Sequence, residues 1–383
     1  MQKLILLYWG TAFLMYLSQI YYPVDAEYNL RHPGKRSFMW RRSDLFMVLV
    51  ITWMTCFSFL RTSYNDTLTY IATFREAETV VEGIKSGTFV DWTGNPWSML
   101  YRSLMHDLTD NFHIYFFFPA LLSSFAVVKL IKRYSANPAL SLLLFFSIGT
   151  YMMYVAALKQ CLAMFFLLLS LLYAIEKKYV RFYLLVLVAI MFHTHSFMFA
   201  IVPLLLEKPW GKNIWLLLGA TVFAMLTYDS TLGAFMEYAQ SLGALVAEIE
   251  VFDGHQINIL RVLVYWVPAL FALIFRQRLF WDSSRTENLF VNLSIVSAFI
   301  LTIGLVQGAN LYARMAGYFE IATIIALPWM IEKLFTRRSV RFVTTCASVL
   351  YFCYFWYENA INRAIDTDYA AISLWQFIQE LFA

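Results

Sequence analysis

Charged residues are scarce in this sequence, and their scarcity excludes a water-soluble fold. Only 14% of the 383 residues are Asp, Glu, Lys or Arg, whereas 61% are apolar and 19% are aromatic. An ordinary soluble domain is about a quarter charged. A soluble fold of this size cannot bury so much apolar surface, so we expect the chain to lie in a membrane along its whole length.

Cysteine is also rare, and several well-known sequence motifs are missing. The four cysteines lie within apolar segments and form no C-x-x-C pair, so neither a disulfide framework nor a zinc site is supported. The sequence has no P-loop, dinucleotide-binding fingerprint, nucleophile elbow or ion-channel filter. We therefore expect no cofactor and no metal. The net charge of +4 gives no reason to expect nucleic acid as a partner.

About a dozen apolar segments make up most of the chain. Many approach the roughly 20 residues that cross hydrocarbon, and in lipid they must be helical because every backbone polar group needs an internal partner. They include residues 45–60, 114–130, 158–174, 214–228, 288–306 and 339–357. Residues 1–22 lack a cleavage site and are interpreted as a retained first span. The prediction is an all-α polytopic membrane protein with about 11–13 transmembrane or re-entrant helices.

The loops between these segments fall into two kinds. Most of the Lys and Arg residues lie in six short loops, which the positive-inside rule assigns to the cytoplasm: 31–42, 129–133, 177–181, 208–212, 276–285 and 333–341. Residues 229–258 instead contain five acidic residues and no Lys or Arg. We therefore place this segment outside, together with residues 61–111.

One stretch does not fit simple alternation. The basic loops 177–181 and 208–212 both look cytoplasmic, yet only about 26 residues separate them, and two full spans need about 40. A re-entrant pair of short helices with His193, Thr194, His195 and Ser196 at its tip resolves this difficulty. A single span is the alternative.

No repeat or linker divides the chain, which we interpret as one domain over residues 1–383. Residues 69–84 have helical spacing, and 91–97 indicate an aromatic turn at the membrane interface. The tail, 359–383, has apolar residues at spacings typical of a helix that lies on the membrane surface.

Four basic residues at outward ends of the apolar segments are candidate site residues. Cations on the side that the positive-inside rule disfavours indicate an anion to be held, and a pyrophosphate suits paired hydrogen bonds from arginine. The alternative for each is a purely structural role, in which the side chain contacts a lipid phosphate or a helix carbonyl. The four are Arg61, Lys159, Arg261 and Arg314. Gln160, which follows Lys159 directly, is a further candidate.

Asp66 follows Arg61 closely enough for the two to meet on a compact turn. It is either a salt-bridge partner or N-cap of a helix starting at Thr67, or a carboxylate that orients or deprotonates a sugar hydroxyl. The neighbouring Asn65, Tyr64 and Tyr70 could supply the hydrogen bonds and flat faces that sugars need; we count all three as candidate substrate-binding residues.

His193 and His195 form a second candidate group. An isolated His in an apolar segment is most often a packing element, but two imidazoles in a membrane are costly without a task, and His titrates where a general base is needed. A metal is disfavoured, because the i, i+2 spacing does not put both rings on one helix face.

Together, these short motifs resemble the EpsG/Wzy-type polysaccharide polymerases. The resemblance covers roughly residues 40 to 360 and is carried by the run 61–70, Lys159-Gln160, Phe192-His193 and Arg314-x-x-x-Tyr318-Phe319. It implies an enzyme of the bacterial cytoplasmic membrane that faces the periplasm or cell exterior. Such an enzyme transfers a growing glycan from undecaprenyl pyrophosphate onto a lipid-linked repeat unit of an exopolysaccharide, capsule or O-antigen. Its partners would be the lipid-linked donor and acceptor and a chain-length regulator.

The sequence departs from this family at Lys159, where an Arg is expected, so the charge is kept but the fork geometry is lost. Our hypothesis has Arg61, Arg314 and one or both of Lys159 and Arg261 holding the pyrophosphate, and His193 or else Asp66 acting as general base. The alternatives are a GT-C-type glycosyltransferase that uses a polyprenyl-phosphate sugar and a transporter of lipid-linked glycans.

Overall fold

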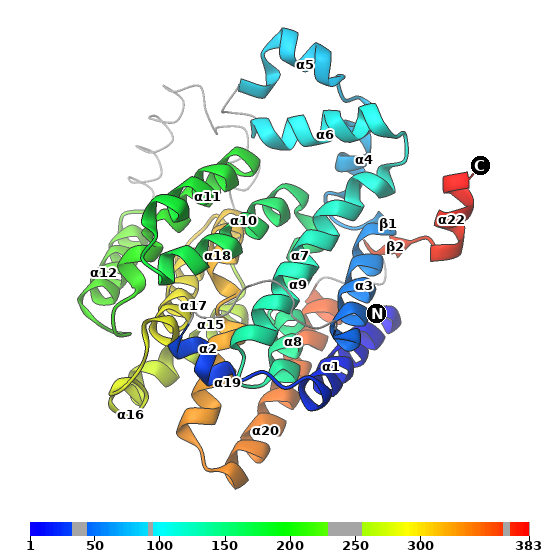
Figure 1. The fold of residues 1–383 in the computed structure, drawn as a ribbon. Coiled ribbons are helices and arrows are strands. Elements are labelled where there is room, and N and C mark those ends of the chain that lie inside the picture. Colours follow the sequence, from blue (N-terminus) through cyan, green and yellow to red (C-terminus); the bar gives the residue numbers. More distant parts are fainter. Residues whose placement is uncertain (33–43, 91–94, 229–254, 363–367, 383) are drawn as a thin grey trace.

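The computed structural model describes residues 1–32, 44–90, 95–228, 255–362 and 368–382, which are almost entirely helical (Figure 1). The elements are α1 (Gln2–Tyr21), α2 (Ala26–Arg31), α3 (Leu45–Phe59), β1 (Arg61–Ser63), α4 (Thr67–Arg75), α5 (Val80–Ser86), η2 (Thr88–Val90), α6 (Pro96–Leu108), α7 (Phe112–Tyr134), α8 (Pro138–Ser147), α9 (Thr150–Ala156), α10 (Leu158–Ile175), α11 (Tyr179–Phe192), η4 (Thr194–Leu205), α12 (Lys212–Leu226), α15 (Ile259–Ile274), α16 (Arg276–Phe280), α17 (Arg285–Ile303), α18 (Ala309–Glu320), α19 (Thr323–Leu334), α20 (Arg337–Trp356), the π-helix η5 (Tyr357–Asn362), β2 (Ala370–Ala371) and α22 (Leu374–Phe382).

The length and hydropathy of the helices confirm a multi-pass membrane protein. Within the described residues, α1, α7, α10 and α17 are each long and apolar enough to cross a membrane. Two bent pairs are each long and apolar enough when taken as one segment: α8 with α9, bent by 55°, and α18 with α19, bent by 53°. Shorter apolar helices are α3, α11, η4, α12 and α15. The six apolar segments named from the sequence are all helical, with ends that shift by a few residues.

Local sequence explains several helix breaks. Gly149, between α8 and α9, has φ of 88°, a left-handed conformation that glycine adopts without steric cost, and this lets the chain turn within one broken segment. Asn65, with φ of 47°, makes a similar turn between β1 and α4, since asparagine tolerates this region better than most residues. After the latter turn, the chain continues from β1 into α4, which lies near α6 at the top of Figure 1.

The stretch around His193 forms a hairpin of two short helices. α11 ends at Phe192 and η4 begins at Thr194, and the two pack against each other. The rings of Phe182 and Phe199 stack with centroids 6.5 Å apart, which requires the chain to fold back at His193. Two short helices with a tip at His193 are therefore confirmed, in place of one continuous helix, and the re-entrant position of the pair in the membrane stays a prediction.

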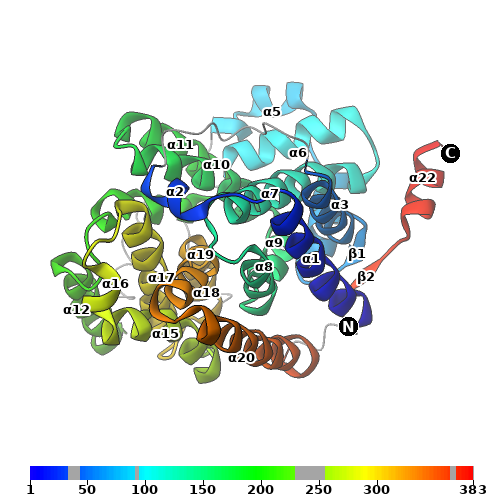
Figure 2. The same cartoon turned by 60° about the horizontal axis from the view of Figure 1, so that its bottom comes forward.

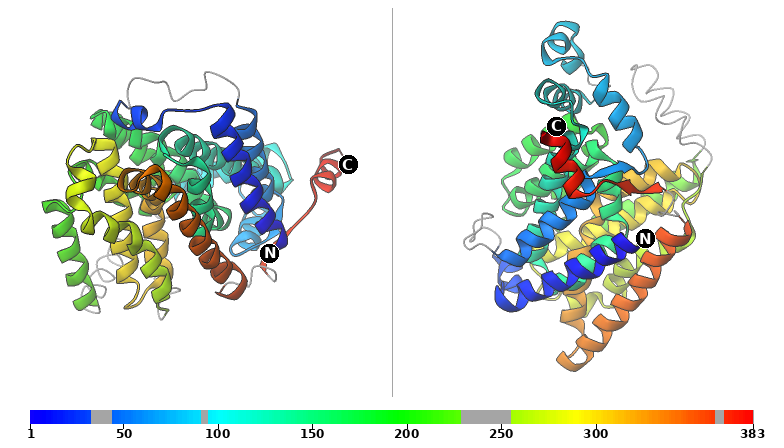
Figure 3. Two further views of the ribbon diagram at one scale, coloured as in Figure 1. Left: turned by 90° about the horizontal axis from the view of Figure 1, so that it is seen from below. Right: turned by 90° about the vertical axis from the view of Figure 1, so that its right-hand side faces the viewer.

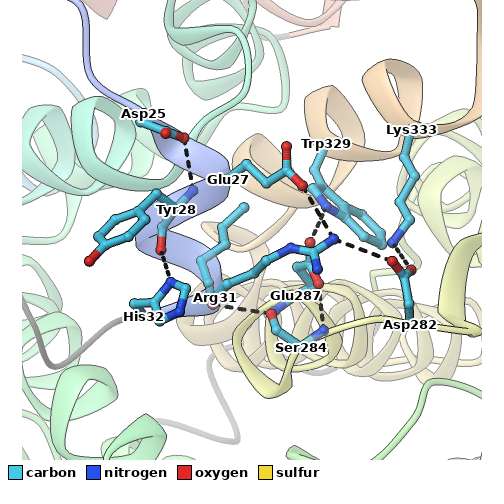
Figure 4. Close-up of polar contacts among 11 residues, drawn as sticks. Asp25, Glu27, Tyr28, Arg31, His32, Asp282, Ser284, Glu287, Trp329 and Lys333 are labelled. Carbon is cyan, nitrogen blue, oxygen red and sulfur yellow. Dashed lines mark hydrogen bonds and ion pairs between the residues drawn. The ribbon is translucent and has the colours of Figure 1, made fainter.

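Residues from three of the basic loops meet in one cluster, whose contacts Figure 4 shows; in Figure 1 the helices beside it, α2, α16 and α19, lie in the lower half of the molecule. Asp282, before α17, accepts hydrogen bonds from Lys333 at 2.8 Å and from Arg31 of α2 at 3.3 Å. The Lys333 hydrogen bond is the main reason why the pKa of Asp282 lies below its usual value. Ser284 also donates to the Leu30 carbonyl oxygen at 3.1 Å. Three of the six loops predicted to share one side of the membrane thus contact one another.

The opposite end of the helices carries the short elements α4, α5, α6, β1 and β2. α3 and α7 run between the two ends: Asp44, which caps α3, pairs with Lys132 of α7 at 3.2 Å, while at their other ends His113 Nδ1 lies 2.8 Å from the Phe59 carbonyl oxygen. α4, α5 and α6 gather at the top of Figure 1, and α22 projects from the side of the helical body in Figures 2 and 3.

Two expectations are corrected here. Residues 69–84 do not form one helix, because α4 ends at Arg75 and α5 starts at Val80 with a capping box between Thr79 and Glu82. Residues 339–356 are helical, as part of α20, and Tyr357 begins η5. α20 is not apolar enough to count among the spans above, since Arg341 and several Ser, Thr and Tyr residues interrupt its sequence. Most of the 31–42 loop, residues 229–254 of the acidic segment and residues 91–94 of the aromatic turn lie outside the described residues.

Candidate functional site

A polar cavity of about 420 Å³ lies at the end of the molecule that carries β1, α4 and β2. Segments that are far apart in the sequence line it: the turn before α4, the end of α9, the starts of α15 and α18, the end of η5 and the residue before Tyr369. The lining residues are Tyr64, Asn65, Asp66, Met152, Met153, Ala156, Ala157, Arg261, Asn310, Ala313, Arg314, Asn362 and Asp368. The size is within the range of ordinary small-molecule sites.

Arg314 and Asp66 face each other in this cavity. Nη2 of Arg314 lies 3.4 Å from Oδ2 of Asp66, and the two side chains are 28% and 37% exposed. The Arg314 carbonyl oxygen accepts a hydrogen bond of 2.8 Å from Nε2 of Gln160, which fixes the α18 backbone against α10. Asp66 occupies the N-cap position of α4 but makes no capping hydrogen bond. From the sequence we expected Asp66 to meet Arg61, but in the structure its ion-pair partner is Arg314.

Arg261, the third residue of α15, also lines the cavity and lies among buried acidic and phenolic groups. Its guanidinium interacts electrostatically with Glu320 and Glu358 and with two tyrosines. The Tyr265 hydroxyl lies 2.5 Å from Oε2 of Glu320, and the hydroxyl of Tyr354 donates to Oε1 of Glu358 at 3.0 Å. Tyr265 is on α15 itself, Glu320 is on α18, Tyr354 is on α20 and Glu358 is on η5, so Arg261 lies where four helical segments meet.

Arg61 lies outside the cavity lining, with 2% of its surface exposed. Its Nη1 donates to the Ser58 carbonyl oxygen at 2.5 Å, its Nε donates to Oγ1 of Thr67 at 3.0 Å, and its guanidinium stacks over the Phe116 ring at 4.1 Å. The side chain thus joins the end of α3 to the start of α4, and its catalytic role stays a prediction.

Tyr64 and Asn65 line the cavity, whereas Tyr70 lies behind it, close to Asp66, Arg314 and Arg61. Burial, with a smaller contribution from Asp66, raises the pKa of Tyr70 to about 12, so that its hydroxyl stays neutral. Tyr70 is therefore a neutral neighbour of the charged pair and is not part of the cavity wall.

His193 and His195 are buried next to each other. His193 contacts Tyr318, which lies one helical turn after Arg314 in α18. Nδ1 of His193 lies 2.5 Å from the hydroxyl of Tyr318, and its ring lies 5.2 Å from that of His195. His193 also interacts electrostatically with Arg314 and Lys159. The predicted residues are therefore neighbours, but His193, His195, Lys159, Gln160 and Tyr318 are not part of the cavity lining.

Three acidic residues at this site were missed by the sequence analysis. Asp368 lines the cavity because β2 pairs with β1, and the sequence offered no signal for that short pairing. Glu320 and Glu358 could have been found from the sequence, because each is a carboxylate within an apolar run. A charge in such a position is energetically costly in a membrane and therefore indicates a function.

No group of three or more His, Cys, Asp or Glu residues that could hold a metal ion occurs within the described part of the chain.

The helices and the cavity define a class: a multi-pass membrane protein with a charged cavity at one end of its helical body. The chain belongs to the EpsG family, whose model matches residues 44–370 and so includes every residue of the cavity wall. This is a family of membrane proteins of polysaccharide biosynthesis, and the resemblance seen in the sequence is confirmed. No curated protein and no solved structure matches the chain.

Proposed function

We propose that this protein is a polysaccharide polymerase, which transfers a glycan from undecaprenyl pyrophosphate onto a lipid-linked repeat unit at the outer face of the bacterial cytoplasmic membrane. The product would be an exopolysaccharide, a capsule or an O-antigen. Family membership gives the pathway class, and the cavity supports the reaction.

The orientation rests on the two ends of the molecule. Arg31, Asp282 and Lys333 meet at the end where three basic loops gather, which the positive-inside rule assigns to the cytoplasm. The cavity lies at the other end and would face outward. Lipid-linked substrates could then reach it from the outer leaflet.

The observation that carries the proposal is the presence of Arg261 and Arg314 in one cavity. Two guanidiniums fixed in a partly buried site favour a ligand with several anionic oxygens, since each can form paired, charge-assisted hydrogen bonds. A pyrophosphate is such a ligand. Asn65, Asn310 and Asn362 line the same cavity and provide the amide donors and acceptors that sugar hydroxyls need.

The reaction needs little more from the protein than position and charge. The acceptor hydroxyl attacks the anomeric carbon of the donor, the bond from that carbon to the pyrophosphate oxygen breaks, and the electron pair leaves with the pyrophosphate. Arg314 and Arg261 stabilise the charge that develops there, because preorganised cations act most strongly where charge appears in the transition state. The ion pair with Asp66 orients Arg314 before substrate arrives.

The remaining predicted residues support this arrangement. Gln160 holds the backbone of Arg314, and Tyr318 holds His193. Lys159 adds positive charge near His193. Asp66 lines the cavity and His193 does not, which favours a carboxylate over the imidazole as the group that meets the acceptor.

Purified protein in lipid nanodiscs, supplied only with a synthetic undecaprenyl-pyrophosphate-linked repeat unit, tests the proposal. A ladder of products spaced by whole repeat units is expected. Addition of a single sugar from a polyprenyl phosphate, lost on adding EDTA, would favour a GT-C-type enzyme instead. Movement of the lipid-linked glycan across vesicles without chain growth would favour a transporter.

A further inference from the structure

The tail of the chain is tied to the outer end of α3 by three contacts. Antiparallel β2 pairs with β1, so that Ala371 faces Arg61 and Ala370 faces Ser63, and the Ile372 amide donates to the Leu60 carbonyl oxygen at 3.0 Å. The surface interpretation of residues 359–383 did not foresee this attachment.

Aromatic contacts on both sides of β2 fix the same attachment. The Tyr369 ring stacks on Phe57 with centroids 4.4 Å apart, and its hydroxyl donates to the Phe57 carbonyl oxygen. Beyond β2, Phe377 of α22 packs edge-on against Phe59 with centroids 5.1 Å apart. Asp368, which directly precedes Tyr369, is thereby held at the cavity wall.

Asp368 differs from the other carboxylate of the cavity in its contacts. Asp66 already has an oxygen 3.4 Å from Arg314. Asp368 forms no hydrogen bond or ion pair with any other residue in the described ranges, and it is exposed. Its carboxylate can therefore meet a substrate hydroxyl without first breaking a contact to such a residue.

We propose that Asp368 is the general base of the reaction. The inference rests on the proposed function and assigns the proton: as the acceptor oxygen bonds to the anomeric carbon and the pyrophosphate leaves, the hydroxyl proton passes to the Asp368 carboxylate. Asp66 orients Arg314, and Asp368 receives the proton. The β1–β2 pairing then makes the C-terminal segment part of the active site.

The test compares Asp368→Asn, Asp368→Glu and the wild type in the nanodisc polymerisation assay. Asparagine keeps the shape but cannot accept the proton, so kcat should fall by about 10²- to 10⁴-fold, the usual contribution of a general base. The KM for the lipid-linked donor and the affinity for undecaprenyl pyrophosphate should stay within about two-fold, since the arginines are intact. Glutamate should restore part of kcat.

The matched control is Glu380→Gln, which changes a carboxylate in the same tail that is not part of the cavity wall. It should behave as the wild type.

Two results would overturn the assignment while leaving the polymerase intact. One is a wild-type kcat in Asp368→Asn. The other is a fall in kcat that is accompanied by a loss of pyrophosphate affinity and a lower melting temperature, which would make the role of Asp368 structural. If the wild type itself makes no polymer from the lipid-linked unit, the proposed function and this inference fail together.

Discussion

Replacing Arg314 by Ala should separate catalysis from folding. The Arg314 side chain is 28% exposed and its ion pair with Asp66 is 3.4 Å long. Such a partly exposed pair contributes about 0.2–1 kcal/mol to stability. The hydrogen bond from Gln160 goes to the main-chain oxygen of Arg314 and survives the substitution. The variant should therefore reach the membrane in normal amount and melt within a few degrees of the wild type.

The effect on rate should be much larger. Loss of one preorganised donor that stabilises transition-state charge typically lowers kcat by about 10²- to 10³-fold, or about 2.7–4 kcal/mol. Arg314→Lys should recover part of this loss, because lysine keeps the charge but cannot form the paired hydrogen bonds of a guanidinium. The order of activity should therefore be wild type, then Lys, then Ala.

The assay is polymer formation in nanodiscs, with membrane abundance and melting temperature measured on the same preparations. Arg75→Ala is a matched control, since Arg75 is an exposed arginine in the last turn of α4 that is not part of the cavity wall. It should leave the rate unchanged. Polymer of wild-type amount and length from Arg314→Ala would refute the role given to the cavity cations.

Three further substitutions probe the surroundings. Tyr318→Phe leaves the buried imidazole at the α11–η4 turn without its hydroxyl partner, which should cost about 1–3 kcal/mol and lower the melting temperature; an unchanged melt would show that this contact is dispensable. Gly10→Ala places a Cβ less than 3.0 Å from the rigid ring of Trp53 in α3 and should cost about 1–3 kcal/mol, whereas Gly219→Ala, where a Cβ meets nothing within 4 Å, should not; equal melts for the two would contradict this packing. Asp282→Asn should remove a pH-dependent contribution: because the hydrogen bond from Lys333 lowers the pKa of Asp282, its stabilisation is present above the ordinary value of 3.8 and is lost as the pH falls through the lowered one. The stability difference between wild type and variant should therefore shrink below pH 3.8, and a difference that grows there would oppose the assignment.

The membrane-crossing body could be predicted because its cause is local. Long apolar runs must be helical in lipid whatever surrounds them, so α3, α7, α10, α12 and α17 follow from composition alone. The hairpin at His193 followed from the short distance between two basic loops. Helix ends and bends were harder to predict from the sequence, because they depend on single residues such as Gly149.

The candidate site was predictable only in part. Arg314, Arg261 and Asp66 were inferred from the cost of charge in apolar segments, and they line one cavity. Arg61 satisfied the same criterion, yet it lies buried against Phe116, because position at a helix end does not determine the direction of a side chain. Asp368 depends on a two-residue strand that pairs with a segment distant in sequence, and no local pattern specifies such a pairing.

The central claim is that a lipid pyrophosphate leaves from the cavity lined by Arg261 and Arg314. The most direct measurement is the ratio of free undecaprenyl pyrophosphate released to repeat units joined, determined by mass spectrometry on purified protein with a defined lipid-linked substrate. One equivalent released per unit joined, with both lost together in Arg314→Ala, is the expected result. Chain growth without that release, or release that is unaffected in Arg314→Ala, would contradict the account.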